Sequence, residues 1–418
     1  MTRQHSFPAT VIEGASVIFP DRIATASVRI EAGIITGIDT PRDGAQVIDG
    51  RGRILAPAFV DIHGDAFERQ LMPRPGVMIP VETALLETDR QLAANGIATA
   101  YHALTLSWEP GLRSVETGWA VLRALIRLAP RLTAANRLQL RWETFCPAAH
   151  SLIATAMNQP DIPALAFNDH TTAALLHPSV ALHDRPFDLI PDYPLTPLDT
   201  PAFRNRIEGR AKRAGMATDD YIALMLSVWA ARDAVPEGIE HIASLARASG
   251  APMLSHDDTQ TETRDFYRAK GAAIAEFPMH ERVFQPARDA GDWIVLGAPN
   301  AMRGGSHLGS ADAGQMIRRG LCDILASDYF YPAMLGAMAQ LHAEGAAPLH
   351  DLWKLVSTNP AAALGLADRG RIATGTRADL VLLDWPDRGT PAPLRTWVAG
   401  RGGYSALPDQ SAPAPISP

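Results

Sequence analysis

Residues that could bind a divalent metal occur at five places along this chain, each directly after a short apolar stretch. These places are His63-Gly64-Asp65, Glu143, Asp169-His170, His256-Asp257-Asp258 and Asp328. Imidazole and carboxylate groups are ligands for zinc, and carboxylates also suit manganese or iron. If the five places meet in the folded chain, they form a site for one or two divalent ions, with zinc expected first and manganese or iron as alternatives.

The spacing within the first place suits two ligands for one ion. His63 and Asp65 are two residues apart, so their side chains lie on the same side of an extended backbone, and Gly64 between them allows close backbone approach. Glu143 could bridge two ions. Asp328 could take a proton from metal-bound water, whose pKa the ion lowers to ~7. A single His or Asp after a strand is more often a cap or a buried hydrogen-bonding residue, so this hypothesis depends on the five places lying together.

Eight predicted strands must bring these residues together. Apolar runs lie at 58–62, 97–102, 138–142, 164–167, 252–255, 273–276, 293–296 and 323–326, with helical patterns between them, for example at 80–95, 113–128, 236–249, 311–319 and 333–344. Strands that alternate with helices indicate parallel β/α units, and eight such units close into a (β/α)8 TIM barrel, an α/β fold. Active sites of such barrels lie at the carboxyl ends of the strands. The pattern therefore predicts one rim that carries all five places.

Two loops on that rim could contact an anionic substrate. The segment GAPNAMRGGSHLG, 297–309, follows the seventh strand and offers Asn300, Arg303, Ser306 and His307. Glycine-rich backbone beside an arginine suits phosphate oxygens, and barrel loops after strands seven and eight are frequent phosphate sites. Arg74, between two prolines, is expected either to add a second anion contact or to lie solvated in a stiff turn. We therefore expect a small phosphorylated substrate.

Short alternating strands at both ends of the chain predict a second, smaller unit. We expect residues 1–55 and 368–405 to form a small β-sandwich domain and residues 56–367 to form the barrel. Residues 406–418 are rich in Pro, Ser and Ala and are expected to form a flexible tail. The stretch 184–250 is long for one connection, so we expect it to add helices at about 202–213 and 217–233 over the barrel mouth.

The composition argues against several classes of protein. The 418 residues carry a formal net charge of −7 and no long basic run, which argues against binding to nucleic acid. No apolar run approaches the ~18 residues of a membrane helix, and the N-terminus lacks the features of a secretory signal. Cys146 and Cys322 are the only cysteines, too few for a disulfide framework. We therefore expect a cytoplasmic protein that binds neither nucleic acid nor membrane.

Taken together, these motifs resemble the amidohydrolase superfamily. That resemblance rests on the strand-end histidines, the split β-domain and the segment STNPAAALGLADRGRIATGTRADLVLLD. More narrowly, the stretches HGDAFERQLMPRPGV, LRWE, NDHT, LSHDD, AEFP and GAPNAMRGGSHLG resemble the diphosphatases of phosphonate metabolism. The resemblance implies release of pyrophosphate from alpha-D-ribose 1-methylphosphonate 5-triphosphate, and it leaves a homodimer open. The metal-site residues that it implies are His63, Asp65, Glu143, His170, His256 and Asp328, the last also as catalytic base.

Two loops depart from the pattern of that family. The fourth-strand motif usually continues into Pro-Gly-Gln, but here the sequence is DHTTAALLH, and TFCPAAHS follows Glu143 where a short His-rich stretch is expected. Both loops are expected to shape the substrate pocket. The alternative substrate is therefore a compound with a scissile C–N bond, such as an amide, a cyclic amide or a deaminase substrate. The intact metal-site residues, with Asp328, argue against a third hypothesis, a non-catalytic binding barrel.

Overall fold

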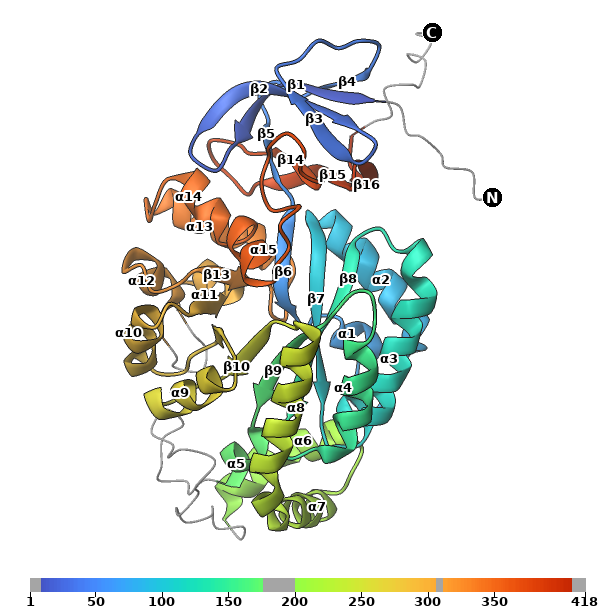
Figure 1. Cartoon of the computed structure of the whole chain (residues 1–418), viewed down its shortest axis with the longest axis vertical. Coiled ribbons are helices and arrows are strands. Elements are labelled where there is room, and N and C mark those ends of the chain that lie inside the picture. The colour runs from blue at the N-terminus through green and yellow to red at the C-terminus, as the bar shows by residue number, and fades with distance from the viewer. Residues whose placement is uncertain (1–8, 176–199, 306–310, 408–418) are drawn as a thin grey trace.

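The computed structural model of the chain describes residues 9–175, 200–305 and 311–407. At its centre is a sheet of eight parallel strands that follow one another in chain order (Figure 1). They are β6 (Phe59–Gly64), β7 (Ile97–Leu106), β8 (Ala135–Glu143), β9 (Ala164–Asn168), β10 (Met253–His256), β11 (Ile274–Glu276), β12 (Trp293–Gly297) and β13 (Ile324–Ala326). The sheet closes where Gly64 pairs in parallel with Asp328. The predicted barrel is confirmed, and each of its eight strands overlaps a predicted one.

The barrel strands are apolar because both of their faces are covered. β7 is buried along all ten of its residues, as parallel strands are when side chains fill the barrel and helices cover its outside. In β8, Leu140 and Trp142 pack in the cluster under the helices. Gln139, Arg141 and Glu143 alternate with them and therefore face the interior of the barrel. The alternation thus carries polar side chains to the inside.

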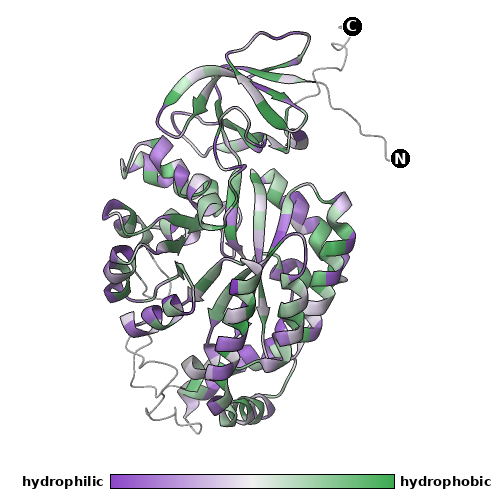
Figure 2. Ribbon diagram, viewed as in Figure 1, coloured by the Kyte–Doolittle hydropathy of each residue, from purple (hydrophilic) through white to green (hydrophobic). Residues whose placement is uncertain are grey.

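Helices surround the barrel and pack their apolar sides against it. They are α1 (Glu68–Leu71), α2 (Val81–Ala94), α3 (Val115–Leu128), α4 (His150–Met157), α5 (His170–Leu175), α6 (Pro201–Ala214), α7 (Thr218–Ala230), α8 (Val235–Ser249), α9 (Thr261–Ala269), α10 (Glu281–Asp289), α11 (Ala298–Arg303), α12 (Ala313–Arg318), α13 (Ala333–Ala343), α14 (Leu349–Lys354) and α15 (Thr358–Ala363). Figure 2 shows both hydrophilic and hydrophobic residues on these helices. In α3, the Ser114 hydroxyl accepts a hydrogen bond from the Thr117 N–H, a common way to begin a helix.

Helices of the long connection cover part of the rim, as predicted. Arg213 of α6 forms an ion pair with Glu109 at 3.0 Å, just beyond the carboxyl end of β7. Arg210 of the same helix donates a hydrogen bond to the carbonyl oxygen of His170 at 3.3 Å, just beyond β9. Helix α7 packs against α6. The connection therefore places two arginines over the carboxyl ends of β7 and β9, which lie on either side of β8.

A second sheet is built from both ends of the chain. Its strands are β1 (Thr10–Ile18), β2 (Ile23–Glu31), β3 (Ile34–Ile38), β4 (Gln46–Asp49), β5 (Ile54–Pro57), β14 (Leu380–Asp384), β15 (Ala392–Val398) and β16 (Arg401–Ser405). The antiparallel pair β5–β14 joins the two ends. In β14, Leu380 and Leu382 pack into the core of this sheet, whereas Val381 and Leu383 pack against barrel residues. One strand therefore ties the sheet to the barrel.

Three further predictions concern membrane helices, the cysteines and the C-terminal tail. No helix in the part of the chain that the structure describes is both long enough and apolar enough to cross a membrane. Cys146 and Cys322 are both buried and free. The predicted tail at 406–418 lies outside the described residues from position 408 onward.

Candidate metal centre and substrate cavity

The predicted metal-site residues all lie at the carboxyl ends of barrel strands. They are His63 and Asp65 at the end of β6, Glu143 at the end of β8, His170 after β9, His256 at the end of β10 and Asp328 after β13. Because the strands are parallel, these ends share one rim. The structure thus brings the six residues to one rim, but it divides them into two groups with different contacts.

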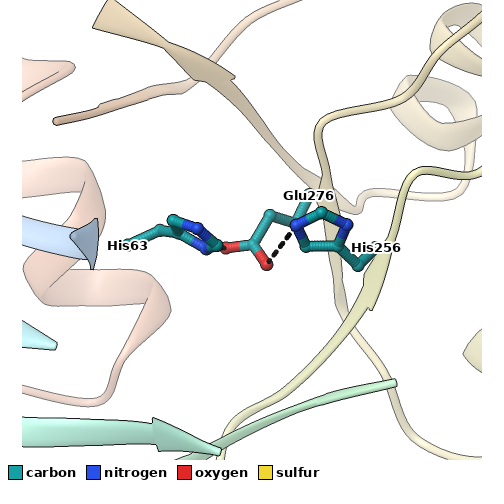
Figure 3. A group of neighbouring side chains, drawn as sticks. All are labelled: His63, His256 and Glu276. Atoms are coloured by element: carbon teal, nitrogen blue, oxygen red, sulfur yellow. Dashed lines mark ion pairs between the residues drawn. The ribbon is translucent and has the colours of Figure 1, made fainter. Parts of the chain in front are cut away.

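The first group contains Glu276, which was not predicted. Glu276 ends β11, and its carboxylate lies between the imidazoles of His63 and His256 (Figure 3). Nδ1 of His63 is 3.0 Å from Oε1 of Glu276, and Nε2 of His256 is 3.9 Å from Oε2. Gln139 donates a hydrogen bond to Oε1 at 2.7 Å and so orients the carboxylate. One ligand atom from each of His63, His256 and Glu276 lies within 4.8 Å of the others, a spacing that one ion can bridge.

Four polar atoms of these three side chains lie outside hydrogen-bond geometry, although carboxylate oxygens lie 3.0 Å from Nδ1 of His63 and 3.1 Å from Nδ1 of His256. Nδ1 of His63, both ring nitrogens of His256 and Oε2 of Glu276 are shielded from solvent and have no partner in hydrogen-bond geometry. Buried polar atoms are nearly always paired, and an unpaired one costs ~1–3 kcal/mol. Two imidazoles and a carboxylate are a common donor set for zinc, manganese or iron. The chemistry of these residues therefore fits a divalent ion.

Asp65 and Asp328 extend this group towards the seam of the barrel, the junction where β13 meets β6. We call these two residues, together with His63, His256 and Glu276, the His63 group. Ligand atoms of His63, Asp65 and Asp328 also lie within 4.8 Å of one another. The Asp328 N–H donates to the carbonyl oxygen of His63, and the Asp65 N–H donates to that of Asp328, each at 3.0 Å. Burial, followed by the charge of Asp65, raises the pKa of the Asp328 carboxyl to about 6. Asp328 is therefore firmly placed and has a proton affinity suited to general-base chemistry.

The remaining predicted residues form a second set, the Glu143 group, made of Glu143, Asn168 and His170. Oε1 of Glu143 lies 2.6 Å from Nδ1 of His170 and accepts a hydrogen bond from Nδ2 of Asn168 at 2.5 Å. Oε2 accepts from the backbone N–H of His170 at 2.9 Å. Burial acts to raise the pKa of Glu143, but the charge of His170 outweighs it and lowers that pKa to about 2. Within the described residues, Glu143 belongs to no cluster with metal-binding spacing, so its bridging role stays a prediction.

Asp257 lies between the two groups. Its Oδ2 is 3.1 Å from Nδ1 of His256 and 3.7 Å from Nε2 of His170. Its φ of 60° is a left-handed conformation, uncommon outside glycine but tolerated by aspartate. This conformation, directly after β10, lets one carboxylate face a histidine from each group. Asp257 therefore links the two groups electrostatically.

A cavity of about 350 Å³ opens beside both groups. Its lining includes His63, Asp65, Arg113, Arg141, His170, His256, Asp257, Asn300, Arg303 and Asp328. The volume falls within the ~300–1,000 Å³ of small-molecule sites. A separate cavity of about 310 Å³, at the start of β8 near Leu122 and Asp161, contains none of the rim residues. The rim cavity is therefore the candidate substrate site.

Asn300 and Arg303, two of the substrate contacts predicted after β12, differ in what their side chains contact. Arg303, the last residue of α11, is exposed and lines the cavity. Asn300 also lines it, but its side chain is bound to the main chain. Its Nδ2 donates to the carbonyl oxygen of Ala311, and its Oδ1 accepts from the N–H of Ala313, each at 3.2 Å. Asn300 therefore holds the loop in place, which leaves Arg303 as the cation that faces the cavity from this loop.

Three other predicted substrate contacts lie elsewhere. Ser306 and His307 lie outside the described residues. Arg74 lies in an exposed turn, where its carbonyl oxygen accepts from the N–H of Val77 at 3.0 Å. Arg74 is not among the residues that line the cavity, so its contact with a substrate stays a prediction.

A smaller cavity of about 90 Å³ lies next to the first one. Arg113 and His170 line both cavities, so the two are adjacent. Arg210 and Arg213 from α6 form another wall of the smaller cavity, and Glu109 and Glu143 also line it. Three arginines thus lie around a small space beside the Glu143 group.

Glu276 and Arg141 are two of the rim residues that the sequence pattern did not indicate. Glu276 ends a predicted strand, 273–276, just as His256 follows the strand 252–255, and that shared position is the signal that could have found it. Arg141 is two residues before Glu143 and lies on the same face of β8. Period-two alternation from Glu143 could have placed it inside the barrel.

Known proteins share both the sequence and the architecture of this chain. Residues 223–402 match the Amidohydrolase family. Over 379 residues the chain is 28% identical to alpha-D-ribose 1-methylphosphonate 5-triphosphate diphosphatase of Escherichia coli (strain K12), a match that covers 89% of this chain and 94% of that enzyme.

Solved structures extend the similarity to the fold. Phenylurea hydrolase B matches with a TM-score of 0.61 at 16% identity, over 94% of this chain and 96% of that one. An adenosine deaminase from Xanthomonas campestris, solved with bound zinc, matches with a TM-score of 0.56 at 13% identity, over 94% of this chain and 92% of that one. Such identities show a shared fold alone. The family match over residues 223–402, the relative that covers 89% of the chain and the shared fold all make this chain similar to hydrolases of the amidohydrolase superfamily.

Proposed function

We propose that this hydrolase is a zinc-dependent diphosphatase of phosphonate metabolism that releases pyrophosphate from alpha-D-ribose 1-methylphosphonate 5-triphosphate. The observation that carries this proposal is the match to the Escherichia coli enzyme of that name, which extends over 89% of this chain and 94% of that one. The solved hydrolases are less similar in sequence, at 13–16% identity for those described above. The substrate of the relative is therefore the first to test.

The charges around the rim support a substrate with several phosphates. Arg113, Arg141 and Arg303 line the main cavity, and Arg210 and Arg213 join Arg113 around the smaller one. Guanidinium groups bind phosphate oxygens through paired N–H donors. Some of this charge is already balanced, since Arg113 pairs with Glu68 at 2.9 Å and Arg213 pairs with Glu109 at 3.0 Å. The five arginines around the two cavities are the reason that we expect a polyanion rather than a neutral amide.

His63, His256 and Glu276 are the residues that we propose to hold the ion. Their buried, unpaired donor atoms converge from three strands, and the zinc in the adenosine deaminase shows that this fold can hold such an ion in another protein. When bound, the ion supplies Lewis acidity, which lowers the pKa of water and neutralises phosphoryl oxygens. Asp65, Glu143 and His170 are the further residues proposed to contact one or two ions at this rim.

Asp328 is the proposed general base. In the hydrolysis, the oxygen of a water molecule bonds to the α-phosphorus, the bond from that phosphorus to the bridging oxygen breaks, and pyrophosphate leaves. Asp328 accepts the proton that the water loses. Its main chain is held between β6 and β13, so the carboxylate is fixed before substrate binds. Positioning of this kind lowers the barrier because no reorganisation is needed during the reaction.

The test is to measure pyrophosphate released by the purified, metal-loaded protein from alpha-D-ribose 1-methylphosphonate 5-triphosphate, with ATP as the comparison substrate. We expect rapid release from the ribose phosphonate and a kcat/KM at least tenfold lower for ATP. A protein with bound metal that releases no pyrophosphate from either compound would overturn the proposal. A panel of amides, cyclic amides and aminopurines would then test hydrolysis of a C–N bond.

A further inference from the structure

Arg141 is an arginine inside the barrel that forms no hydrogen bond and no ion pair at contact distance with any described residue. Its side chain projects from β8 between those of Gln139 and Glu143, and only 7% of the residue is exposed. Nε is shielded from solvent without a hydrogen bond. Glu143 is the nearest carboxylate along the strand, but its two oxygens are bound by Asn168 and His170. The structure gives Arg141 no carboxylate within ion-pair distance in the described ranges 9–175, 200–305 and 311–407.

Arg264 shows how this barrel treats a buried arginine that has a structural role. Arg264 is fully buried, and its Nε donates to Asp292 at 2.9 Å. Its other nitrogens donate to Ser255 and to the carbonyl oxygens of Ala272 and Ile274. A buried cation is tolerated when it is paired and hydrogen-bonded in this way, and it is costly when it is not. Arg141 lacks such partners although it is nearly as buried.

The surroundings of Arg141 explain where a partner could come from. Arg141 lines the 350 Å³ cavity together with His63, His256 and Asp328. Because all four residues line one cavity, the guanidinium faces the same space as the proposed metal ligands. A divalent ion at those ligands would add further positive charge. The region therefore favours an anion that reaches both the ion and the guanidinium.

We propose that Arg141 binds a phosphoryl group of the substrate and holds it against the metal centre. The choice of a phosphoryl group rests on the proposed function, whereas the need for an anion rests on the buried, unpaired guanidinium alone. Two N–H donors of one guanidinium match two oxygens of one phosphoryl group. Arg141 is thus a substrate-binding residue on a strand of the barrel, in contrast to Arg303, which approaches the cavity from the exposed end of α11.

The experiment compares Arg141→Met with a matched control, Arg137→Met. Arg137 lies on the same strand, but its partners are Tyr101 and Asp161 and it lines a different cavity. The probe is inorganic phosphate, titrated into the metal-loaded proteins by calorimetry, with metal content measured before and after. We expect Arg141→Met to bind phosphate at least tenfold more weakly than the wild type, with metal content unchanged, and Arg137→Met to match the wild type. Phosphate affinity in Arg141→Met within twofold of the wild type would overturn the proposal.

Thermal unfolding separates a ligand-binding arginine from a structural one. In phosphate-free buffer, Arg141→Met is expected to unfold at or above the midpoint temperature of the wild type, because an unpaired buried charge has been removed. Added phosphate should raise the midpoint of the wild type and of Arg137→Met but not that of Arg141→Met. A lower midpoint for Arg141→Met that rises normally with phosphate would show a structural role and contradict the proposal. If Arg141→Met does not fold, Arg141→Lys replaces it, with an intermediate loss of phosphate affinity expected.

The same proteins distinguish failure of this proposal from failure of the proposed function. Wild-type protein that binds phosphate through Arg141 but releases no pyrophosphate from the ribose triphosphate would refute the function and keep the assignment of Arg141. Wild-type protein that releases pyrophosphate, with an Arg141→Met variant of unchanged KM and phosphate affinity, would keep the function and refute the assignment.

Discussion

The His63 group and the Glu143 group lie on one rim but differ in how their polar atoms are satisfied. In the Glu143 group, Glu143 accepts hydrogen bonds from Asn168 and from the backbone of His170. In the His63 group, ring nitrogens of two histidines and an oxygen of Glu276 are buried without any hydrogen bond. The folded chain thus satisfies both oxygens of Glu143, whereas we propose that an ion completes the His63 group. Buried nitrogen and oxygen atoms without hydrogen bonds, rather than the mere presence of His and Asp, therefore make the His63 group the place where we first expect an ion.

The largest effect is expected from the His63 group. Glu276→Gln keeps the size of the side chain but removes the charge that a divalent ion requires. We expect the variant to lose its bound metal, measured by elemental analysis, and to show no detectable turnover. Glu281→Gln, at an exposed ion pair with Arg319 on α10, is the matched control and should behave as the wild type. Normal metal content in Glu276→Gln would show that Glu276 is not needed to bind the ion and would contradict this assignment.

Asp328→Asn should separate catalysis from metal binding within the same group. We expect kcat to fall by ~10²–10⁴-fold, the usual contribution of a general base, with metal content unchanged because His63, His256 and Glu276 are intact. Steady-state kinetics and elemental analysis on one preparation check both points. Full activity would remove Asp328 as the base, and loss of metal would make it a ligand instead.

The Glu143 group should contribute to the free energy of unfolding of the metal-free protein in a way that depends on pH. The pKa of Glu143 is lowered from 4.5 to about 2, so its ionised form stabilises the fold above pH 4.5, and this contribution is lost as the pH falls towards 2. At ~1.4 kcal/mol per pKa unit, Glu143→Gln should lower the free energy of unfolding by about 3 kcal/mol at pH 6 and by less at pH 3. Urea unfolding at both pH values measures the difference. An equal difference at the two pH values would mean that the Glu143–His170 contact does not control stability.

The smallest effect is expected outside both groups, at Arg303. Arg303→Ala removes an exposed cation at the edge of the cavity. We expect KM for the triphosphate to rise about tenfold, in line with ~1.5 kcal/mol for a hydrogen bond to a charged group, while metal content stays the same. Arg318→Ala, at an exposed ion pair with Glu344 on α12, is the control. An unchanged KM would show that this loop does not hold phosphate.

The sequence predicted the barrel well because each strand is covered on both faces. An element such as β7, buried along its whole length, leaves a continuous apolar run that marks a strand without knowledge of its neighbours. The inserted helices were also predicted, since α6 and α7 carry helical patterns in a connection too long for one loop. Local patterns of apolar residues were therefore enough to predict most of the strands and helices.

The site was harder to predict because it depends on contacts between distant residues. His63 and His256 end apolar strands and were selected for that reason. Glu276 ends a strand of only three residues, and its role becomes visible only from its contacts with Gln139 and His63 in the folded chain. Likewise, Arg141 is unusual only because nothing pairs with it, and the sequence does not show the absence of a partner. Arg74 was selected from its prolines alone, and the structure places it outside the cavity lining.

The contacts between the first and last barrel strands also determine when, during synthesis and folding, the protein can become active. Ser327 donates hydrogen bonds to Asp61, which precedes it by 266 residues, and the neighbouring Gly64 and Asp328 pair across the same seam. During synthesis, the strand that bears His63 emerges early, whereas its seam partners emerge only after most of the barrel has been made. A nascent chain that ends before residue 328 therefore lacks the proposed general base. Turnover begins only when the last strand docks on the first, so activity reports the completion of folding.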